Sequence, residues 1–305
     1  MVTKELFKYR SVTACLKAAY DLMSDQLGSL LKKTWWAVLI YAVFLALTTY
    51  FRMPNKALHD WGETSPWSSY LLQTFVYVGT WIASFLMGGS IWTWLNKKSL
   101  GKNILHFMAS LILCDLLLYL FLLGGTAGIN AFFTSLGIKA AASFVVLIIT
   151  LVITLPFAHI VPCVMLKGDG EKIRPWQMYV SGLRHFGSIF KMGFLAGIII
   201  AIISCILFIP AILLGGAQTI SQLGALEGDP LGVPGYFTPL VLVVLTVSLF
   251  IFLYLSTWLC LSLAYLYGSH KTQDMEKEER RLSLEQEPAE SSHNRIIQHK
   301  KIERT

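Results

Sequence analysis

Residues 239–267 read PLVLVVLTVSLFIFLYLSTWLCLSLAYLY, an apolar run without a single charged side chain. A bilayer core about 30 Å thick requires about 20 apolar residues in a helix that rises about 1.5 Å per residue. The run therefore predicts a membrane-spanning helix, and five further runs meet the same test. The six expected spans cover residues 34–51, 70–95, 104–124, 141–166, 191–214 and 239–267.

The composition of the whole chain agrees with a membrane protein. Of its 305 residues, 55% are hydrophobic and 14% are charged, and the mean hydropathy is +0.59. A soluble domain carries about 25% charged residues. None of the runs alternates polar and apolar residues over ten-residue segments, as the strands of a transmembrane barrel do. We therefore expect an all-α membrane protein whose six helices form three hairpins.

Lys and Arg are distributed unevenly over the segments that join the spans. The segments on one side, which include both termini, carry 22 of the 25 basic residues, and the loops on the other side carry 3. An excess of Lys and Arg marks the cytoplasmic side of a membrane protein. We expect a multi-pass protein of a bacterial inner membrane with both termini in the cytoplasm. Its basic residues then meet anionic lipid headgroups, and nucleic acid is not an expected partner.

One sequence pattern occurs twice. Residues 25–40 read DQLGSLLKKTWWAVLI, and residues 184–199 read RHFGSIFKMGFLAGII. Each copy follows an amphipathic stretch, residues 11–31 and 174–190, in which apolar residues recur every three or four positions. We predict two amphipathic helices on the cytoplasmic interface of the membrane. Gly28 and Gly187 are expected at the bends where the chain turns into the bilayer.

Asp115 and His159 are the candidate polar residues inside the spans. Asp115 lies near the middle of the third span, where an acid costs at least about 2.5 to 3.5 kcal/mol and must face protein, water or a partner. His159 differs from it in depth by about one helical turn. It lies between Pro156 and Pro162, which are expected to kink the fourth span. A polar contact between helices and a site for protons or cations both stay open.

The remaining patterns indicate packing rather than chemistry. Gly193, Gly197 and Ala201 form small-residue steps that predict close helix contact in the fifth span. The five cysteines are scattered singly, and the histidines lack the spacing of a metal motif. No catalytic or nucleotide-binding motif occurs. The sequence therefore predicts no metal, no cofactor and no enzymatic activity.

Residues 268–305 have a different composition from the rest of the chain. They carry eight basic and eight acidic side chains and no Phe, Trp or Tyr. We expect a disordered cytoplasmic tail that follows a membrane domain of residues 1–267. A second interpretation is that this tail docks onto a protein partner.

The layout of the second repeat resembles a known group of proteins. The stretch LPFAHIVPCVMLKGDG at residues 155–170 is followed by IRPWQMYVSGLRHFGSIFK at residues 173–191, an amphipathic segment that leads into a span. This order resembles bacterial six-span proteins that are similar to the membrane domain attached to some glycerophosphodiester phosphodiesterases. The resemblance covers most of residues 10–267 and implies a fold, but no activity, because the chain contains no phosphodiesterase domain.

Two classes of function follow from these patterns. The sequence favours a non-enzymatic accessory, scaffold or membrane-organising protein. The alternative is a transporter or channel for a small or lipid-like solute that uses Asp115. The repeat relates the first span to the fifth, whereas the inverted repeats of many transporters relate the first span to the fourth. The repeat thus counts against transport.

Overall fold

The computed structural model describes residues 5–53, 63–132, 136–167, 175–226, 234 and 236–302, and every regular element within these ranges is helical. Six helical stretches are long and apolar enough to cross a membrane. The expectation of an all-helical, multi-pass chain is therefore confirmed. The six stretches are Leu27–Phe51, Pro66–Asn96, Leu100–Gly125, Ala141–Leu166, Phe186–Leu207 and Phe237–Ser283.

Ten helices carry the architecture of the described part of the chain. They are α2 (Val12–Asp25), α3 (Leu27–Phe51), α5 (Pro66–Asn96), α6 (Leu100–Phe132), α7 (Leu136–Thr154), α8 (Phe157–Leu166), α9 (Pro175–Arg184), α10 (Phe186–Leu207), α11 (Ile209–Leu226) and α12 (Phe237–Ile302).

Prolines divide two of the expected spans. Pro156 separates α7 from α8, and Pro210 follows directly on the break between α10 and α11. A proline has no N–H to donate, and its ring clashes with the carbonyl group four residues earlier. Pro162 remains inside α8. The predicted kink of the fourth span is thus found at the first of its two prolines.

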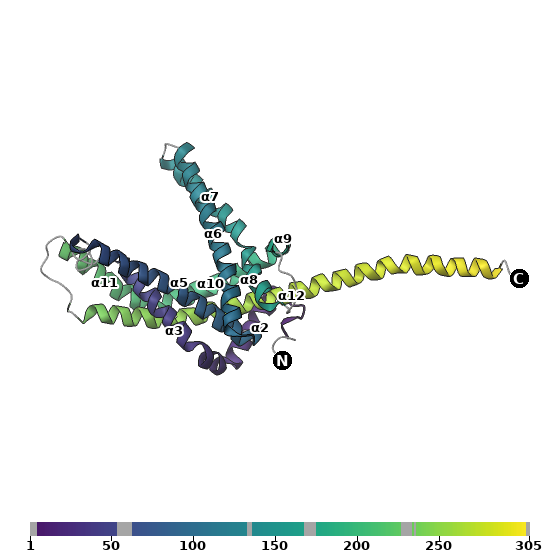
Figure 1. The fold of residues 1–305 in the computed structure, drawn as a ribbon, viewed down its shortest axis with the longest axis horizontal. Helices are drawn as coiled ribbons and strands as arrows, with labels where there is room; N and C mark the ends of the chain where they lie inside the picture. Colours follow the sequence, from purple (N-terminus) through teal and green to yellow (C-terminus); the bar gives the residue numbers. More distant parts are fainter. Residues whose placement is uncertain are drawn as a thin grey trace.

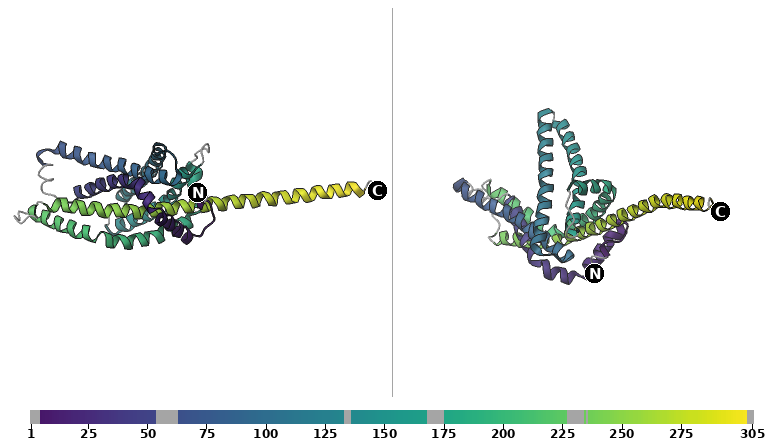
Figure 2. Two further views of the ribbon diagram at one scale, coloured as in Figure 1. Left: turned by 90° about the horizontal axis from the view of Figure 1, so that it is seen from below. Right: turned by 45° about the vertical axis from the view of Figure 1, so that its right-hand side comes forward.

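The helices form one bundle and one pair that leans away from it. The bundle contains α3, α5, α10, α11 and the first half of α12, whereas α6 and α7 rise from its side (Figure 1). Two further views show the same arrangement (Figure 2). The α6 helix contacts α5 and α8 as well as α7, so the pair is joined to the bundle through α5 and α8.

The best-buried apolar side chains lie where α2, α3, α10 and α12 meet. Leu30, Met192 and Leu261 are almost completely buried there. The indole nitrogen of Trp258 in α12 donates a hydrogen bond of 3.2 Å to the carbonyl oxygen of Leu16 in α2. This bond satisfies two buried polar groups and fixes α2 along α12.

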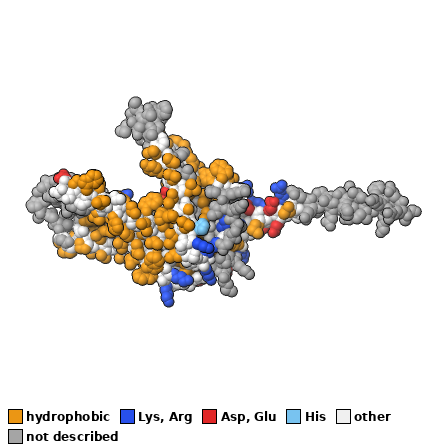
Figure 3. Space-filling view, viewed as in Figure 1, with side chains coloured by type: hydrophobic (Ala, Val, Ile, Leu, Met, Phe, Trp, Pro, Cys, Tyr) orange, Lys and Arg blue, Asp and Glu red, His pale blue; other side chains and the backbone are white. Residues whose placement is uncertain are grey.

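The outer surface of the bundle is largely apolar. Figure 3 shows hydrophobic side chains over most of the visible face, with most Lys and Arg side chains toward the end from which α12 extends. Ile206 of α10 and Leu71 of α5, for example, are 67% and 70% exposed. An apolar surface of this extent agrees with helices that are long and apolar enough to cross a membrane.

The two copies of the repeated pattern break their helices at equivalent positions. Gln26 separates α2 from α3, and His185 separates α9 from α10, at nearly the same backbone angles: φ −115° and ψ 19° against φ −102° and ψ 16°. The bends were expected at Gly28 and Gly187. They therefore lie two residues before the expected positions. Nothing lies within 4 Å of a Cβ atom built on either glycine, so neither bend requires a missing side chain.

The apolar stripes of α2 and α9 face different surroundings. Leu16 and Ala19 of α2 are buried, because α2 packs along α12. Trp176, Val180 and Leu183 of α9 are 73%, 38% and 45% exposed. The stripe of α2 is therefore a contact within the protein, and the stripe of α9 faces outward.

The small residues of α10 make no close contact with another helix in the described part of the chain. No atom lies within 4 Å of a Cβ atom built on Gly193 or Gly197, and Ala201 is exposed. This differs from the predicted packing role. A close contact of that kind occurs instead at Gly79 in α5, which lies against the ring of Phe44 in α3.

The last helix continues beyond the expected end of the membrane domain. It runs through Gly268 to Ile302 without a break, which differs from the disordered tail expected from residue 268. The N-terminal segment, residues 5–10, packs on its first turns beyond the span. The Ser269 hydroxyl accepts a hydrogen bond from the amide of Arg10 and donates one to its carbonyl oxygen, both at 2.9 Å. The Arg10 guanidinium also lies 5.1 Å from the centre of the Tyr265 ring.

The contact between α12 and the N-terminal segment gives a test of this part of the fold. A Cβ atom at Gly268 would overlap the backbone of Leu6. Gly268→Ala should therefore destabilise the purified protein by about 1–3 kcal/mol, measured by thermal unfolding in detergent. Gly197→Ala is the matched control, because alanine favours the helix by up to about 1 kcal/mol and meets no neighbour. Equal stability of the two variants would contradict the contact.

Candidate functional site

Three buried histidines from three parts of the chain form one cluster. His159 lies in α8, His185 in the turn between α9 and α10, and His270 in α12, and each is at most 8% exposed. The rings of His185 and His270 are stacked, with centroids 3.9 Å apart and planes 11° from parallel. The His159 ring lies 5.6 Å from that of His270 and 5.3 Å from the ring of Tyr267.

Each histidine occupies its position because of a break or a contact described above. The Pro156 break starts α8, and the amide of His159 donates to the Pro156 carbonyl oxygen at 3.1 Å in its first turn. His185 is itself the break in the second copy of the repeat. His270 follows Ser269, which the N-terminal segment holds. The cluster thus forms where the Pro156 break, the second repeated bend and the contact between α12 and the N-terminal segment meet.

The polar atoms of the cluster are only partly satisfied. The Nε2 atom of His185 lies 3.4 Å from Oδ2 of Asp274, one turn beyond His270 on α12. The Nδ1 atom of His270 is buried and has no hydrogen-bond partner. A buried polar atom without a partner costs about 1–3 kcal/mol, and native structures contain few of them. This atom points to a group that the site is built to accept.

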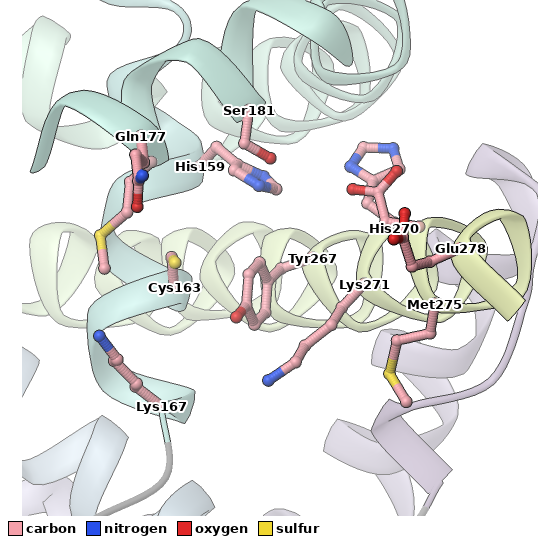
Figure 4. A pocket seen from close by; sticks show the side chains of 12 residues that line it. His159, Cys163, Lys167, Gln177, Ser181, Tyr267, His270, Lys271, Met275 and Glu278 are labelled. Carbon is pink, nitrogen blue, oxygen red and sulfur yellow. The ribbon is translucent and has the colours of Figure 1, made fainter. Parts of the chain in front are cut away.

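A pocket of about 420 Å³ opens beside the cluster (Figure 4). It lies where two spans end, because α8 ends at Leu166 and the expected sixth span ends at Tyr267. Three helices contribute its lining side chains. They are His159 and Cys163 from α8, Lys167 directly after it, Gln177, Met178 and Ser181 from α9, and Tyr267, His270, Lys271, Asp274, Met275 and Glu278 from α12.

A network of amide groups holds the end of α8 in place. Asn96 at the end of α5 donates to the Asn103 side chain at 2.9 Å and to the Met165 carbonyl oxygen at 3.1 Å. Asn103 in α6 in turn donates to Thr93 at 2.9 Å. The Nζ atom of Lys98 donates to the Lys167 carbonyl oxygen at 2.7 Å. One wall of the pocket is therefore fixed by the α5–α6 connection.

The histidines do not form a metal site as they stand. Within the part of the chain that the structure describes, no three His, Cys, Asp or Glu side chains are grouped as metal ligands. Cys163 lines the same pocket as His159 and His270 but does not complete such a group. The chemistry of the pocket instead comes from hydrogen-bonding rings, ammonium groups and carboxylates.

The structure separates the two residues that the sequence singled out. His159 lies in the cluster, whereas Asp115 is half-buried in α6, within the pair of helices that leans away from the bundle. The contacts of His159 are with His185, Tyr267 and His270. A relay between Asp115 and His159 is therefore not part of this arrangement.

Sequence analysis missed His185 and His270. His185 stands in the second copy of the repeat, in the RHFGS motif, and its position at the bend was assigned to the neighbouring Gly187. His270 falls in the segment expected to be disordered. The available signal was that both histidines, like His159, lie in the sequence beside the ends of expected spans that carry the basic residues.

Comparison of the chain with protein families, with curated proteins and with solved structures finds no match. The resemblance to the membrane domain of glycerophosphodiester phosphodiesterases stays a prediction.

The amide network predicts the response of the site to a single substitution. Asn103 is 2% exposed, and Asn103→Ala would remove its hydrogen bonds with the half-buried Asn96 and with Thr93. The Asn96 side chain would keep only the Met165 carbonyl oxygen and the Lys98 amide as partners. We expect a loss of about 2–3 kcal/mol in thermal unfolding. Lys102→Ala, at the exposed neighbouring position of α6, should change stability by less than about 0.5 kcal/mol. A tolerated Asn103→Ala would show that the network does not hold α8.

Proposed function

We propose that this chain is a scaffold protein of a bacterial inner membrane that holds the helical extension of α12 at the cytoplasmic surface for a protein partner. Its six spans form three hairpins, both termini are cytoplasmic, and α9 lies on the cytoplasmic interface. The extension is the observation that carries the proposal.

The extension projects far from the bundle. From Asp274 to Ile302, α12 is about 40 Å long at a rise of about 1.5 Å per residue. No other described helix lies alongside its outer part in any of the three views (Figures 1 and 2). Leu282 is 50% exposed on it. An isolated helix in water is only marginally stable, so a partner that packs on this surface would stabilise it.

The proposed orientation rests on the even number of spans and on charge. The N-terminal segment packs against Gly268 and Ser269 of α12, which supports both termini leaving the membrane on one side. The excess of Lys and Arg on the terminal side supports the cytoplasm as that side. The pairing of α3 with α5, of α6 with α7 and of α12 with α10 and α11 supports the hairpins.

The outward stripe of α9 supports contact with lipid. An exposed Trp176 beside Val180 and Leu183 has the character of a helix that lies in the headgroup region. The stripe of α2 packs on α12, so the proposal of an interfacial helix is kept for α9 alone.

The orientation can be tested with reporters fused to the C-terminus of the full chain. Green fluorescent protein should fluoresce there, and alkaline phosphatase should be inactive, because both report a cytoplasmic C-terminus. A matched pair of fusions at Leu226, the last residue of α11, should give the opposite result. Active phosphatase at the C-terminus would overturn the orientation.

The scaffold role can be tested with a photoreactive amino acid placed on the extension in living cells. Leu282 should give one protein adduct of defined mass, and Arg280, on the other side of the helix, should give less. Ile206, an exposed position of α10 in the lipid-facing surface, serves as the control and should give no adduct. Absence of an adduct at every position from 279 to 282 would contradict a docked partner.

A further inference from the structure

We propose that the pocket beside the histidine cluster binds a phosphate ester that carries a primary ammonium group, as in the headgroup of phosphatidylethanolamine. The phosphate lies toward Lys167 and Lys271, and the ammonium group lies toward Asp274 and Glu278. The inference rests on the placement of this end of the spans at the membrane surface, given under the proposed function, and is independent of any partner for the α12 extension.

The pocket-facing stripe of α12 has its charges in a defined order. Tyr267, Lys271, Asp274 and Glu278 follow one another at spacings of four, three and four residues, which places them on one face of the helix. Lys271 and Glu278 are about 10 Å apart along the axis. The hydroxyl and the cation are thus nearer the span, and the two acids are farther out.

A second cation reinforces the inner end of the pocket. Lys167 is the first residue after α8. Figure 4 shows the side chains of Lys167, Tyr267 and Lys271 toward one end of the pocket and those of His270 and Glu278 toward the other. The pocket therefore has a cationic end and an acidic end rather than a uniform charge.

This order matches the arrangement of a zwitterionic headgroup in a bilayer. The phosphate of a phospholipid lies next to the hydrocarbon, and its ammonium group extends from there into the water. The lysines lie beside the ends of two spans, and the acids lie farther along α12 as it leaves the bundle (Figure 1). Both charged groups of the headgroup would meet their opposite charge at the depth where a membrane presents them.

Buried polar groups show that the pocket is more than a set of surface charges. His159 and His270 line it and are each 4% exposed. The unpartnered Nδ1 atom of His270 lies toward the acidic end and, as an unprotonated ring nitrogen, can accept a hydrogen bond from the ammonium group. Ser181 of α9 adds a hydroxyl group to the lining. Asp274 contacts His185 at 3.4 Å through one oxygen and retains further acceptor positions for an ammonium group.

The lining argues against other headgroups. Two carboxylates repel a headgroup that is purely anionic, such as phosphatidylglycerol. The quaternary nitrogen of phosphatidylcholine has no N–H to donate to them. The primary ammonium of phosphatidylethanolamine carries three donors, as the lysine ammonium does.

The test measures binding of four probes to the delipidated full chain in detergent. Short-chain phosphatidylethanolamine, phosphatidylcholine and phosphatidylglycerol are compared with free phosphoethanolamine, by calorimetry and by native mass spectrometry. We expect phosphatidylethanolamine to bind at least tenfold more tightly than the other two lipids. If free phosphoethanolamine binds as tightly as the lipid, the pocket recognises a phosphate ester with an ammonium group, as proposed, and its ligand is a soluble molecule rather than a lipid. Equal binding of the three lipids would overturn the proposal.

Variants of the lining distinguish this pocket from general lipid binding. Lys271→Met and Glu278→Gln should each weaken binding of phosphatidylethanolamine at least tenfold. Glu278→Lys, at an exposed and structurally tolerant position, should shift the preference toward phosphatidylglycerol. Lys277→Met, which removes a charge from α12 outside this lining, is the matched control and should bind as the parent chain does.

Unchanged binding in Lys271→Met and in both Glu278 variants would place the lipid elsewhere and overturn the site. The reporter fusions at the C-terminus do not depend on the pocket. The cross-linking at Leu282 does not depend on it either. A loss of the headgroup preference with both results intact would therefore overturn the site and leave the proposed orientation and scaffold role standing.

Discussion

Hydrocarbon offers no water to a backbone amide or carbonyl group, and this constraint shapes most of the molecule. Each buried backbone group that lacks a partner costs several kcal/mol in lipid, so a span must satisfy its own hydrogen bonds as a helix. The six apolar stretches meet this requirement, because each is helical. The outer surface of the bundle is apolar, as a surface that faces lipid must be. Within the described residues, irregular backbone occurs in the N-terminal segment before α2, at the proline breaks, at the repeated bends and in the connections between spans.

The helix α12 connects the bundle to the N-terminal segment, the histidine cluster and the exposed extension. Within the bundle it packs against α2, α3, α10 and α11, and beyond the span it meets the N-terminal segment at Ser269. The stretch from Tyr267 to Glu278 supplies His270 to the histidine cluster and half of the lining of the pocket. A single continuous helix therefore links the core, the candidate site and the exposed extension.

The sequence predicts the features that follow from local composition and periodicity, such as the spans. It is less informative about features that depend on contacts between residues far apart in the chain. Six apolar runs define the spans because length and hydropathy are local properties. The two bends were expected at glycines, but Gln26 and His185 form them, since the repeated segment sets the break rather than one flexible residue. The helix at residues 268–274 packs on the N-terminal segment at Gly268 and Ser269, a contact that composition alone does not indicate. The cluster was missed for the same reason, because its histidines are up to 111 residues apart, from 159 to 270.

The central claim is that the last span continues beyond Tyr267 as an ordered helix, because the cluster and the pocket depend on it. Hydrogen–deuterium exchange of the full chain in lipid nanodiscs measures this directly. The account predicts slow exchange of the amides of residues 268–274, comparable to the neighbouring end of the span, and faster exchange toward Ile302. Complete exchange from Gly268 onward at the earliest time point would contradict it.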